Sequence, residues 1–405
     1  MQQTGRTLVM KVLAIAPQPF FSPRGTPFSV YYRTMVKAQM GCSVDLLTYG
    51  QGEDVDIPGV RIIRIPDFGM LGSIKIGPSF LKLFLDIFLV LWAVGLLLRN
   101  RYDFVHAHEE AVFFCAFLKP VFRYKLIYDM HSSLPQQLGN FKFTTSRIIK
   151  GLFEKLEEFS IKQADAVITI CPDLANYVTG LILNQKKHFL IENSIFDPVR
   201  IVSKSGGSRP DEGARSCQQA AAFLQERPCV VYAGTLEPYQ GIDLLITSFK
   251  DVLKNAPQAG LLIAGGSPSQ INEYQGLVDR LGLNRHVLFT GRVSPDTARS
   301  FSRSAAVLVS PRSSGTNTPL KIYEQLASGI PLVATDIHSH TQVLSDKIAI
   351  LVKPEPAALA GGILEALDPQ GRGRTAAENA LRLYEQKYSR SAYEAKMKAL
   401  LELVS

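Results

Sequence analysis

Cysteine is scarce and scattered in this chain of 405 residues. The five cysteines form no Cys-x-x-Cys pair, so the sequence offers neither a zinc-ribbon spacing nor an even disulfide framework. This usage favours a reducing compartment. A signal peptide is not evident either, because no charged start leads into a long apolar stretch. We therefore expect a cytoplasmic protein, with peripheral attachment to the inner face of the cytoplasmic membrane as a further possibility.

A strong excess of one charge is also missing. The 44 lysines and arginines stand against 36 acidic residues, which leaves a formal net charge of +8. This excess is too modest and too evenly spread to predict a nucleic-acid partner. It remains compatible with an anionic membrane surface or with phosphorylated small molecules. The composition, 46% hydrophobic and 20% charged, is that of a folded globular protein.

Long hydrophobic runs are lacking, with one exception at residues 81–98. The unbroken apolar part of this run, residues 87–98, is shorter than the roughly 20 residues that span a bilayer. We expect a helix buried against a sheet, and a helix lying on a membrane surface is the main alternative. Residues 112–155 contain seven basic and two acidic side chains among many aromatics. Docking on anionic lipid and a solvated basic face explain that segment equally well.

Strand-like and amphipathic segments alternate along the chain, which predicts parallel βαβ units. A Gly- and Ser-rich stretch interrupts the alternation near residue 205. We expect an α/β protein with two Rossmann-like, doubly wound domains that face a central cleft. The expected divisions are an acceptor-side domain at 1–195, a linker or insertion at 196–228, a nucleotide-binding domain at 229–385, and a carboxyl-terminal helix at 386–405 that packs back on the first domain.

One polar loop in the second half precedes a predicted helix. The loop at 313–317 would present backbone N–H groups at a helix start, where phosphate or sugar hydroxyls bind readily. Lys321 lies in the first helical turn, where a cation opposes the helix dipole unless an anion is bound nearby. Lys321 and Glu324 share one helix face at a spacing of three. Taken alone, the two residues favour a plain ion pair on a solvated helix.

Several segments of the chain are similar, in their order and spacing, to one enzyme family. VVYAGTLEPYQGIDLLI, LLIAGG, VLFTGRVS and the PLKIYE helix resemble the donor site of retaining nucleotide-sugar glycosyltransferases of the GT-B fold, family 4. VLAIAPQPFFSPRGTPFSV, DFVHAHEE and YDMHSSLPQQL resemble that family's amino-terminal loop and its two His-bearing strand ends. The resemblance implies metal-independent transfer, without a cofactor, from a nucleotide sugar, expected to be a UDP-sugar. The expected acceptor is a hydroxyl of a lipid- or polyprenyl-linked glycan in the cell envelope.

The resemblance also assigns roles to individual residues. It implies His131 and Lys321 as catalytic residues. The residues implied for donor binding are Gly234, Thr235, Gln240, Gly265, Arg292, Arg312, Gly315, Thr316, Asn317 and Glu324. The residues implied for acceptor binding are Gly25, His108 and Glu109. His106 is expected to point the other way along its strand and to have only a structural role.

The chain departs from the family pattern where the diphosphate is usually held. Thr316 stands at the position of the first glutamate of the donor helix, and Thr235 and Gln240 replace the usual Arg and Lys. We expect Lys321 and Arg312 to supply the missing charges, because a leaving diphosphate needs a fixed cation in a site without a metal. Two alternatives stay open: a nucleotide-sugar epimerase of the same fold, and a non-catalytic sugar- or lipid-binding pseudoenzyme.

Overall fold

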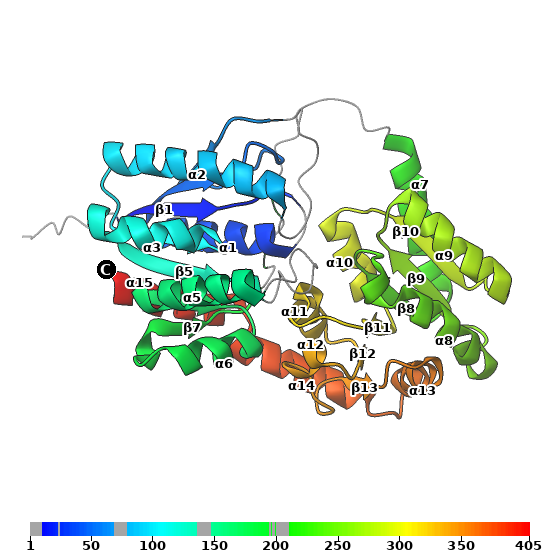
Figure 1. Cartoon of the computed structure of the whole chain (residues 1–405). Coiled ribbons are helices and arrows are strands. Elements are labelled where there is room, and N and C mark those ends of the chain that lie inside the picture. Colours follow the sequence, from blue (N-terminus) through cyan, green and yellow to red (C-terminus); the bar gives the residue numbers. More distant parts are fainter. Residues whose placement is uncertain are drawn as a thin grey trace, which may run out of the picture. The chain divides into compact units, whose positions relative to one another are not determined.

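The chain forms two compact units, each with a parallel sheet of its own (Figure 1). The computed structural model describes residues 10–22, 25–68, 79–135, 147–193, 196, 199 and 210–405. Unit 1 is Met1–Lys204 together with Arg390–Ser405, and unit 2 is Ser205–Ser389. The carboxyl-terminal segment thus belongs to the unit that contains the amino terminus.

Unit 1 is built on a seven-stranded sheet in the order β3-β2-β1-β4-β5-β6-β7. All neighbouring strands are parallel. The chain moves outward from β1 to β3 and then returns to the other side of β1, so the strand order reverses between β1 and β4. The strands are β1 (Lys11–Ala16), β2 (Ser43–Thr48), β3 (Val60–Arg64), β4 (Phe104–His108), β5 (Lys125–Met130), β6 (Ala166–Thr169) and β7 (His188–Leu190).

Helices cover both faces of this sheet. Helices α2, α3, α5 and α6 contact one another in succession, whereas α1 contacts α15. Right-handed crossovers place the first group on one face and α1 on the other. The helices are α1 (Gly25–Gln39), α2 (Phe80–Arg99), α3 (Ala111–Phe122), α5 (Arg147–Gln163), α6 (Pro172–Leu181), the short 3₁₀ helix η2 (Gln185–Lys187) and α15 (Arg390–Val404).

Unit 2 has a six-stranded parallel sheet in the order β10-β9-β8-β11-β12-β13. Its strand order reverses between β8 and β11. The strands are β8 (Cys229–Ala233), β9 (Gly260–Ala264), β10 (Val287–Gly291), β11 (Val307–Ser310), β12 (Leu332–Thr335) and β13 (Ile350–Val352). The helices are α7 (Pro210–Glu226), η3 (Pro238–Gln240), α8 (Ile242–Asn255), α9 (Pro268–Leu281), α10 (Pro295–Arg303), α11 (Leu320–Leu326), α12 (His338–Thr341), α13 (Pro356–Leu367) and α14 (Gly373–Lys387).

The alternation read from the sequence is confirmed as two doubly wound α/β units. The expectation of a linker or insertion at 196–228 did not include the 17-residue helix α7, which occupies Pro210–Glu226 of that segment. The sequence CQQAAAFLQE within it consists mainly of helix formers. Ala220 of α7 is buried, and Phe223 packs against the core of unit 2.

Helix α2 is buried along one stripe only. Leu85, Leu89, Ala93 and Leu97 recur every four residues and pack into the core of unit 1. By length and composition the helix could cross a membrane. A core helix of this kind is usually mostly buried, but only 22% of the most apolar stretch of α2 is buried. Leu81, Phe88 and Leu96 are partly buried and pack beside this stripe. The remaining large apolar side chains are exposed: Phe80, Leu83, Phe84, Ile87, Leu91, Trp92 and Leu98. The helix therefore serves as a core helix and also presents an apolar face.

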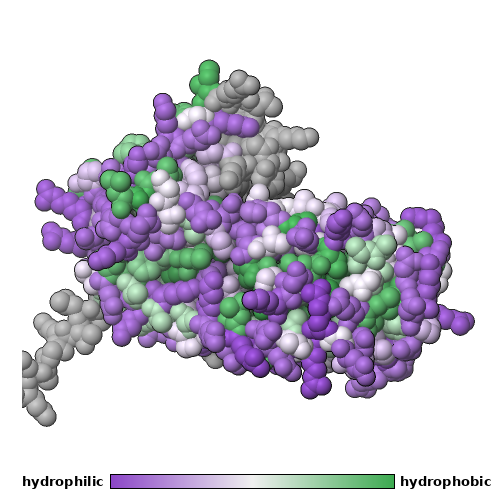
Figure 2. Space-filling view, turned by 90° about the horizontal axis from the view of Figure 1, so that it is seen from below, coloured by the Kyte–Doolittle hydropathy of each residue, from purple (hydrophilic) through white to green (hydrophobic). Residues whose placement is uncertain are grey.

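One face of the molecule allows a comparison with α2. On the face shown in Figure 2, hydrophilic residues predominate and apolar residues form scattered groups between them. Monomeric proteins rarely expose large continuous apolar patches. An exposed face as apolar as that of α2 therefore needs an explanation in terms of function.

Candidate active site

Four loops with polar residues follow β8, β9, β10 and β11 at the carboxyl edge of the unit 2 sheet. In open α/β sheets, ligands bind at this edge, where the strand order reverses. The reversal in unit 2 lies between β8 and β11. The loop after β8 and the start of α11 after β11 meet there, because Lys321 of α11 contacts Gln240 of the β8 loop.

Two glycines allow the backbones after β8 and β9 to pack closely. Gly265 has a φ of 128°, and a Cβ atom on it would lie 1.9 Å from the carbonyl oxygen of Gly234. The Gly234 N–H donates to the carbonyl of Ala264 over 2.9 Å. A side chain at Gly265 would force the two loops apart, whereas a Cβ atom on Gly234 would lie 3.0 Å from the Tyr232 hydroxyl.

Lys321 has no acidic side chain as a partner among the described residues. Its Nζ donates to Gln240 Oε1 over 3.2 Å and lies 4.1 Å from the centre of the Tyr232 ring. Burial, reinforced by the neighbouring charge of Arg312, lowers the pKa of Lys321 to about 7. The amide of Gln240 and the aromatic face stabilise the cation only in part, so an anion would be favourable at this point.

Arg312, in the loop that follows β11, is a second cation at this place. Its Nη1 donates to the carbonyl of Asn317 over 3.1 Å, and its guanidinium lies 5.1 Å from the centre of the Tyr239 ring. Burial lowers the pKa of Arg312 as well, and its Nε is buried with no hydrogen-bond partner among the described residues. Within that part of the chain, no carboxylate forms an ion pair with Arg312 or Lys321. The two residues make a positive site suited to a phosphate group.

The loop between Arg312 and α11 is compact. A Cβ atom on Gly315 would lie 2.2 Å from Arg312 Nη2, so glycine leaves room for the guanidinium. The Thr316 carbonyl accepts from Gln342, and the Asn317 carbonyl holds Arg312. The loop thus positions the cation with its backbone and leaves the exposed Thr316 side chain directed to solvent.

Glu324 does not pair with Lys321, the ion pair considered from the sequence. Its Oε1 accepts from Arg299 Nη2 of α10 over 3.3 Å. Burial raises the pKa of Glu324, and Arg299 opposes that effect. The remaining predicted donor residues, Thr235 and Arg292, are exposed. Arg299 was missed from the sequence because α10 gives no sign of its neighbour in α11.

The predicted acceptor residues lie where the strand order of unit 1 reverses. Gly25 begins α1, which follows β1, and Glu109 comes directly after β4. The backbone of Glu109 is left-handed, with φ at 49°, a conformation that costs energy in residues other than glycine and clusters at functional sites. Burial and the neighbouring Glu110 raise the pKa of Glu109 to about 7.

Three histidines and one aspartate converge inside unit 1. His131 follows β5 and is 3% exposed, and its Nε2 lies 3.2 Å from His108 Nδ1 and 3.4 Å from Asp129 Oδ1. The expectation that His106 points the other way along its strand is wrong, because residues two apart in a strand share a face. The His106 and His108 rings stack with their centres 4.5 Å apart. His108 is fully buried in this cluster.

Buried charges surround the histidines. Arg33 Nε donates to Asp129 Oδ2 over 2.9 Å, while its other nitrogens donate to the Tyr393 hydroxyl of α15 and the Ile191 carbonyl. Burial alone would raise the pKa of Asp129, but Arg33 and the histidines outweigh it and hold that pKa well below its usual value. Burial lowers the pKa of His131. The sequence signal that could have revealed this network is Asp129, an acidic residue near the end of the buried strand β5.

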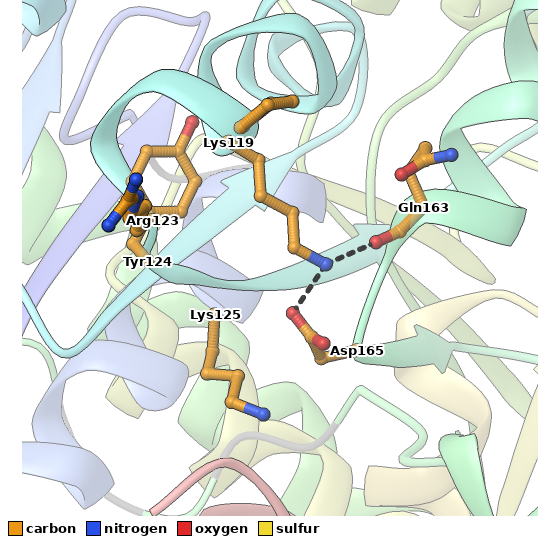
Figure 3. A pocket seen from close by; sticks show the side chains of 7 residues that line it. Lys119, Arg123, Tyr124, Lys125, Gln163 and Asp165 are labelled. Carbon is orange, nitrogen blue, oxygen red and sulfur yellow. Dashed lines mark hydrogen bonds and ion pairs between the residues drawn. The ribbon is translucent and has the colours of Figure 1, made fainter.

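A hollow of about 310 Å³ lies at the other end of the same strands (Figure 3). It is lined by the end of α3, the start of β5 and the end of α5. Lys119 points across it and binds Asp165 and the Gln163 carbonyl at 2.8 Å and 2.6 Å. Arg123 and Lys125 are exposed at its rim. The hollow is basic and separate from the histidine cluster.

Both halves of the chain match models of protein families. Residues 30–195 match the model described as Glycosyltransferase Family 4, and residues 217–386 match the model described as Glycosyl transferases group 1. Together the two matches cover most of both units.

Curated relatives align along nearly the whole chain. A phosphatidyl-myo-inositol mannosyltransferase of Mycobacterium tuberculosis is 24% identical over 371 residues, which covers 89% of this chain and 88% of that protein. An uncharacterized glycosyltransferase of Methanocaldococcus jannaschii is 24% identical over 373 residues and covers 86% of each chain.

Solved structures show the same fold over the whole length. Sucrose-phosphate synthase from Thermosynechococcus elongatus has a TM-score of 0.72 at 21% identity and covers 97% of this chain and 98% of its own. The Anabaena protein HepE in complex with UDP-glucose has a TM-score of 0.67 at 16% identity, with 97% and 99% covered.

Proposed function

The chain belongs to the glycosyltransferases of the GT-B fold, family 4, and from that membership we propose that it transfers a sugar from a UDP-sugar to a lipid- or polyprenyl-linked glycan with retention of configuration. The observation that supports the donor class most directly is the pair of cations at the carboxyl edge of unit 2. Lys321 and Arg312 have no carboxylate partner among the described residues. Lys321 donates to Gln240 and Arg312 donates to the Asn317 carbonyl, in loops where glycines make room for close packing.

In this proposal, Lys321 and Arg312 bind the diphosphate and stabilise the charge that develops as it leaves. These cations supply the charge that a metal supplies elsewhere, and no cofactor enters the scheme. Lys321 belongs to α11 but contacts Gln240 in the loop after β8. Its positive charge would replace the charge that the uncharged Gln240 does not provide in that loop. Glu324 accepts a hydrogen bond from the ribose while Arg299 holds it.

The proposed chemistry needs no protein nucleophile. The acceptor hydroxyl attacks the anomeric carbon from the face on which the diphosphate leaves, and a phosphate oxygen takes the hydroxyl proton. His131 contacts the donor sugar, and Gly25 and Glu109 line the acceptor side of unit 1. For a hydroxyl held in this position, most of the rate acceleration comes from its proximity to the anomeric carbon and its orientation.

We extend the proposal to the acceptor's location. The exposed face of α2 continues onto two neighbouring helices, with Phe117 and Val121 on α3 and Leu152 and Phe159 on α5. Phe117 and Phe159 stack with their centres 5.2 Å apart. A helix layer with an apolar outer face and basic residues at its ends suits the surface of an anionic bilayer. Such binding, on the cytoplasmic face, would bring a lipid-linked acceptor to the enzyme.

Donor binding and turnover test the first part of this proposal. Calorimetry with UDP, GDP and ADP in the presence of EDTA should show the tightest binding for UDP. A panel of UDP-sugars with a polyprenyl-linked acceptor should then give one product whose anomeric configuration, read by NMR, equals that of the donor. Conversion of the donor without acceptor would instead identify an epimerase. Folded protein that binds none of the nucleotides would identify a pseudoenzyme.

Vesicle sedimentation tests the membrane part. The protein should bind vesicles of phosphatidylcholine with phosphatidylglycerol at low salt and bind pure phosphatidylcholine weakly. Leu91→Glu and Arg123→Glu should each reduce binding, because they place charge repulsion on the apolar face and at the basic rim. Lys250→Glu on the exposed surface of α8 is the matched control. Equal binding of all variants would contradict this surface.

A further inference from the structure

The hollow at the amino edge of the unit 1 sheet has a neutral floor (Figure 3). Lys119 Nζ lies 2.8 Å from Asp165 Oδ2 and donates to the Gln163 carbonyl at the end of α5 over 2.6 Å. At the end of α3, the Arg123 N–H donates to the Lys119 carbonyl. Carbonyl groups of both helix ends thus have donors, which reduces the partial negative charge that such ends carry.

Two further cations of the lining have no such partner. Arg123 and Lys125 are exposed, and their side chains make no hydrogen bond or ion pair with the residues that the structure describes. The one acidic residue among the described lining residues is Asp165, which Lys119 neutralises. The hollow, with a volume of about 310 Å³, therefore has two positive charges in excess and room for a phosphate group.

Arg123 occupies a position where glycine is the usual residue. Its backbone ends α3 in the left-handed conformation, with φ at 58° and ψ at 31°, which a side chain makes unfavourable. The cap needs only the N–H of Arg123, and glycine offers that as well. A cation also favours the dipole at a helix end, but Lys119 already provides one in the last turn. The Arg123 side chain therefore has a role beyond the end of the helix.

An exposed apolar stripe of α3 ends at the hollow. Phe117, Pro120 and Val121 are exposed, and their spacing of three and four places them on one side of the helix. Pro120 also lines the hollow. The Phe117 ring stacks on Phe159 of α5. Cations at the end of an apolar stripe match a molecule that has a phosphate at one end and hydrocarbon chains at the other.

We propose that the hollow binds the headgroup of one anionic phospholipid, with Arg123 and Lys125 on the phosphate and the acyl chains along Phe117 and Val121. A phosphate monoester carries about two negative charges at neutral pH, which matches these two cations. The inference rests on the membrane contact proposed above. It goes further, because it predicts saturable binding of one lipid instead of a general attraction between charged surfaces. The hollow lies at the opposite end of the strands from the histidines, so this lipid anchors the enzyme and is not the acceptor.

Calorimetry on the full chain with dihexanoyl phosphatidic acid, kept below the concentration at which it forms micelles, tests the site. We expect one lipid per chain, and binding of inorganic phosphate weaker by roughly tenfold or more, because it has no chains to bury. Arg123→Asn and Lys125→Gln should each weaken lipid binding roughly tenfold, since each removes a charged hydrogen-bond donor. Arg123→Lys should retain most of the affinity. Lys250→Gln, on the exposed surface of α8, is the matched control.

Arg123→Gly separates lipid binding from folding. Glycine removes the cation and also relieves the left-handed backbone. The midpoint of thermal unfolding, followed by the fluorescence of Trp92 on α2, should therefore stay the same or rise while lipid binding is lost. A lower midpoint would show that Arg123 serves the end of α3, and would overturn the role given to its side chain.

Three further results would overturn the inference: no saturable binding of the short-chain lipid, equal binding by all variants, or inorganic phosphate bound as tightly as the lipid. The last result would identify a soluble phosphate as the ligand. Vesicle sedimentation distinguishes this failure from that of the proposed membrane contact. If vesicles bind and Leu91→Glu weakens that binding while the short-chain lipid does not saturate, the apolar surface stands and the hollow is wrong. If the short-chain lipid saturates and vesicles do not bind, the hollow stands and the membrane contact is wrong.

Discussion

Arg33 in unit 1 is a fully buried cation and Lys321 in unit 2 is a partly buried one. Both lie near the carboxyl edge of a parallel sheet, but their surroundings differ. Arg33 donates to a carboxylate, a phenol and a carbonyl. Lys321 has one amide and an aromatic ring. Accordingly the pKa of Arg33 is raised by Tyr393 and Asp129 despite burial, whereas burial lowers that of Lys321.

This difference separates a structural cation from a binding cation. A buried charge whose donors all have partners gains nothing from a ligand, and its removal leaves the partners unpaired. A buried charge without a counter-ion is costly until an anion arrives. The same reasoning connects α15 with unit 1, because Tyr393 takes one bond of Arg33 and Lys396 pairs with Glu192 at 2.6 Å.

Removing the structural cation should have the largest effect. Arg33→Met leaves Asp129 buried without its main partner, which should lower the free energy of unfolding by about 3–5 kcal/mol. Urea unfolding at pH 7.5, followed by the fluorescence of Trp92 on α2, reports on unit 1. Arg61→Met is the matched control. Arg61 also pairs with an aspartate, but its side chain is 61% exposed, so we expect a loss below about 1 kcal/mol.

The pH dependence of this loss has a definite sign. In the unaltered protein the low pKa of Asp129 contributes stability above the unfolded value near pH 4, and this contribution is lost only in stronger acid. Without Arg33, burial raises that pKa and the ionised carboxylate becomes a penalty that grows with pH. The deficit of Arg33→Met should therefore be smaller at pH 5 than at pH 7.5. A deficit equal at both values would contradict the role given to Asp129.

Removing the binding cation should affect ligand affinity and leave stability intact. Lys321→Met should weaken UDP binding roughly ten- to a hundredfold, because hydrogen bonds to charged groups are worth about 1.5–3 kcal/mol. Its unfolding free energy should be unchanged or higher, since a desolvated charge has been removed. Lys353→Met, an exposed lysine next to β13, should leave UDP binding as it is. Unchanged affinity in Lys321→Met would remove the distinction drawn above.

Glu324 should have a smaller effect, confined to the ribose. Glu324→Gln keeps the shape but replaces a charged acceptor with a neutral one, a difference of about 1 kcal/mol or roughly fivefold in affinity. Changing Glu324 and the ribose hydroxyl separately and together isolates the contact between them, as in a double-mutant cycle. The unaltered protein should discriminate UDP from 2′-deoxyuridine diphosphate, and Glu324→Gln should discriminate less. Equal discrimination by both proteins would mean that Glu324 serves Arg299 alone.

The sequence was sufficient for the architecture and for residues that follow strands. Parallel strands place their carboxyl ends on one edge, so His131, Lys321 and Arg312 could be expected there. The two-unit fold could be predicted because strands and helices alternate along the chain and the alternation is interrupted once, near residue 205. Helix α7 was missed because the glycines and charges before it dominated the interpretation of residues 196–228.

Contacts between distant segments could not be predicted in this way. Arg33 and Asp129 are 96 residues apart, and Arg33 and Tyr393 are 360 apart. Nothing local to α1 shows which carboxylate its arginine meets. The pairing of Glu324 with Arg299 instead of Lys321 depends on how α10 lies beside α11. The apolar character of α2 could be recognised from the sequence. How much of the helix the sheet covers could not be predicted, because that depends on packing between distant segments.

Proton uptake gives the finest test of the difference between the two cations. At pH 8 most of the free protein should hold Lys321 neutral, because its pKa is about 7, and a bound diphosphate should restore the charge. UDP binding should therefore take up close to one proton, seen by calorimetry in Tris and phosphate buffers, and affinity should fall as pH rises further. Lys321→Arg should bind UDP without proton uptake, since arginine stays charged. Tight binding by the unaltered protein with no uptake at pH 8 would mean that Lys321 is already charged when free, so that its surroundings stabilise it as fully as those of Arg33 stabilise the guanidinium.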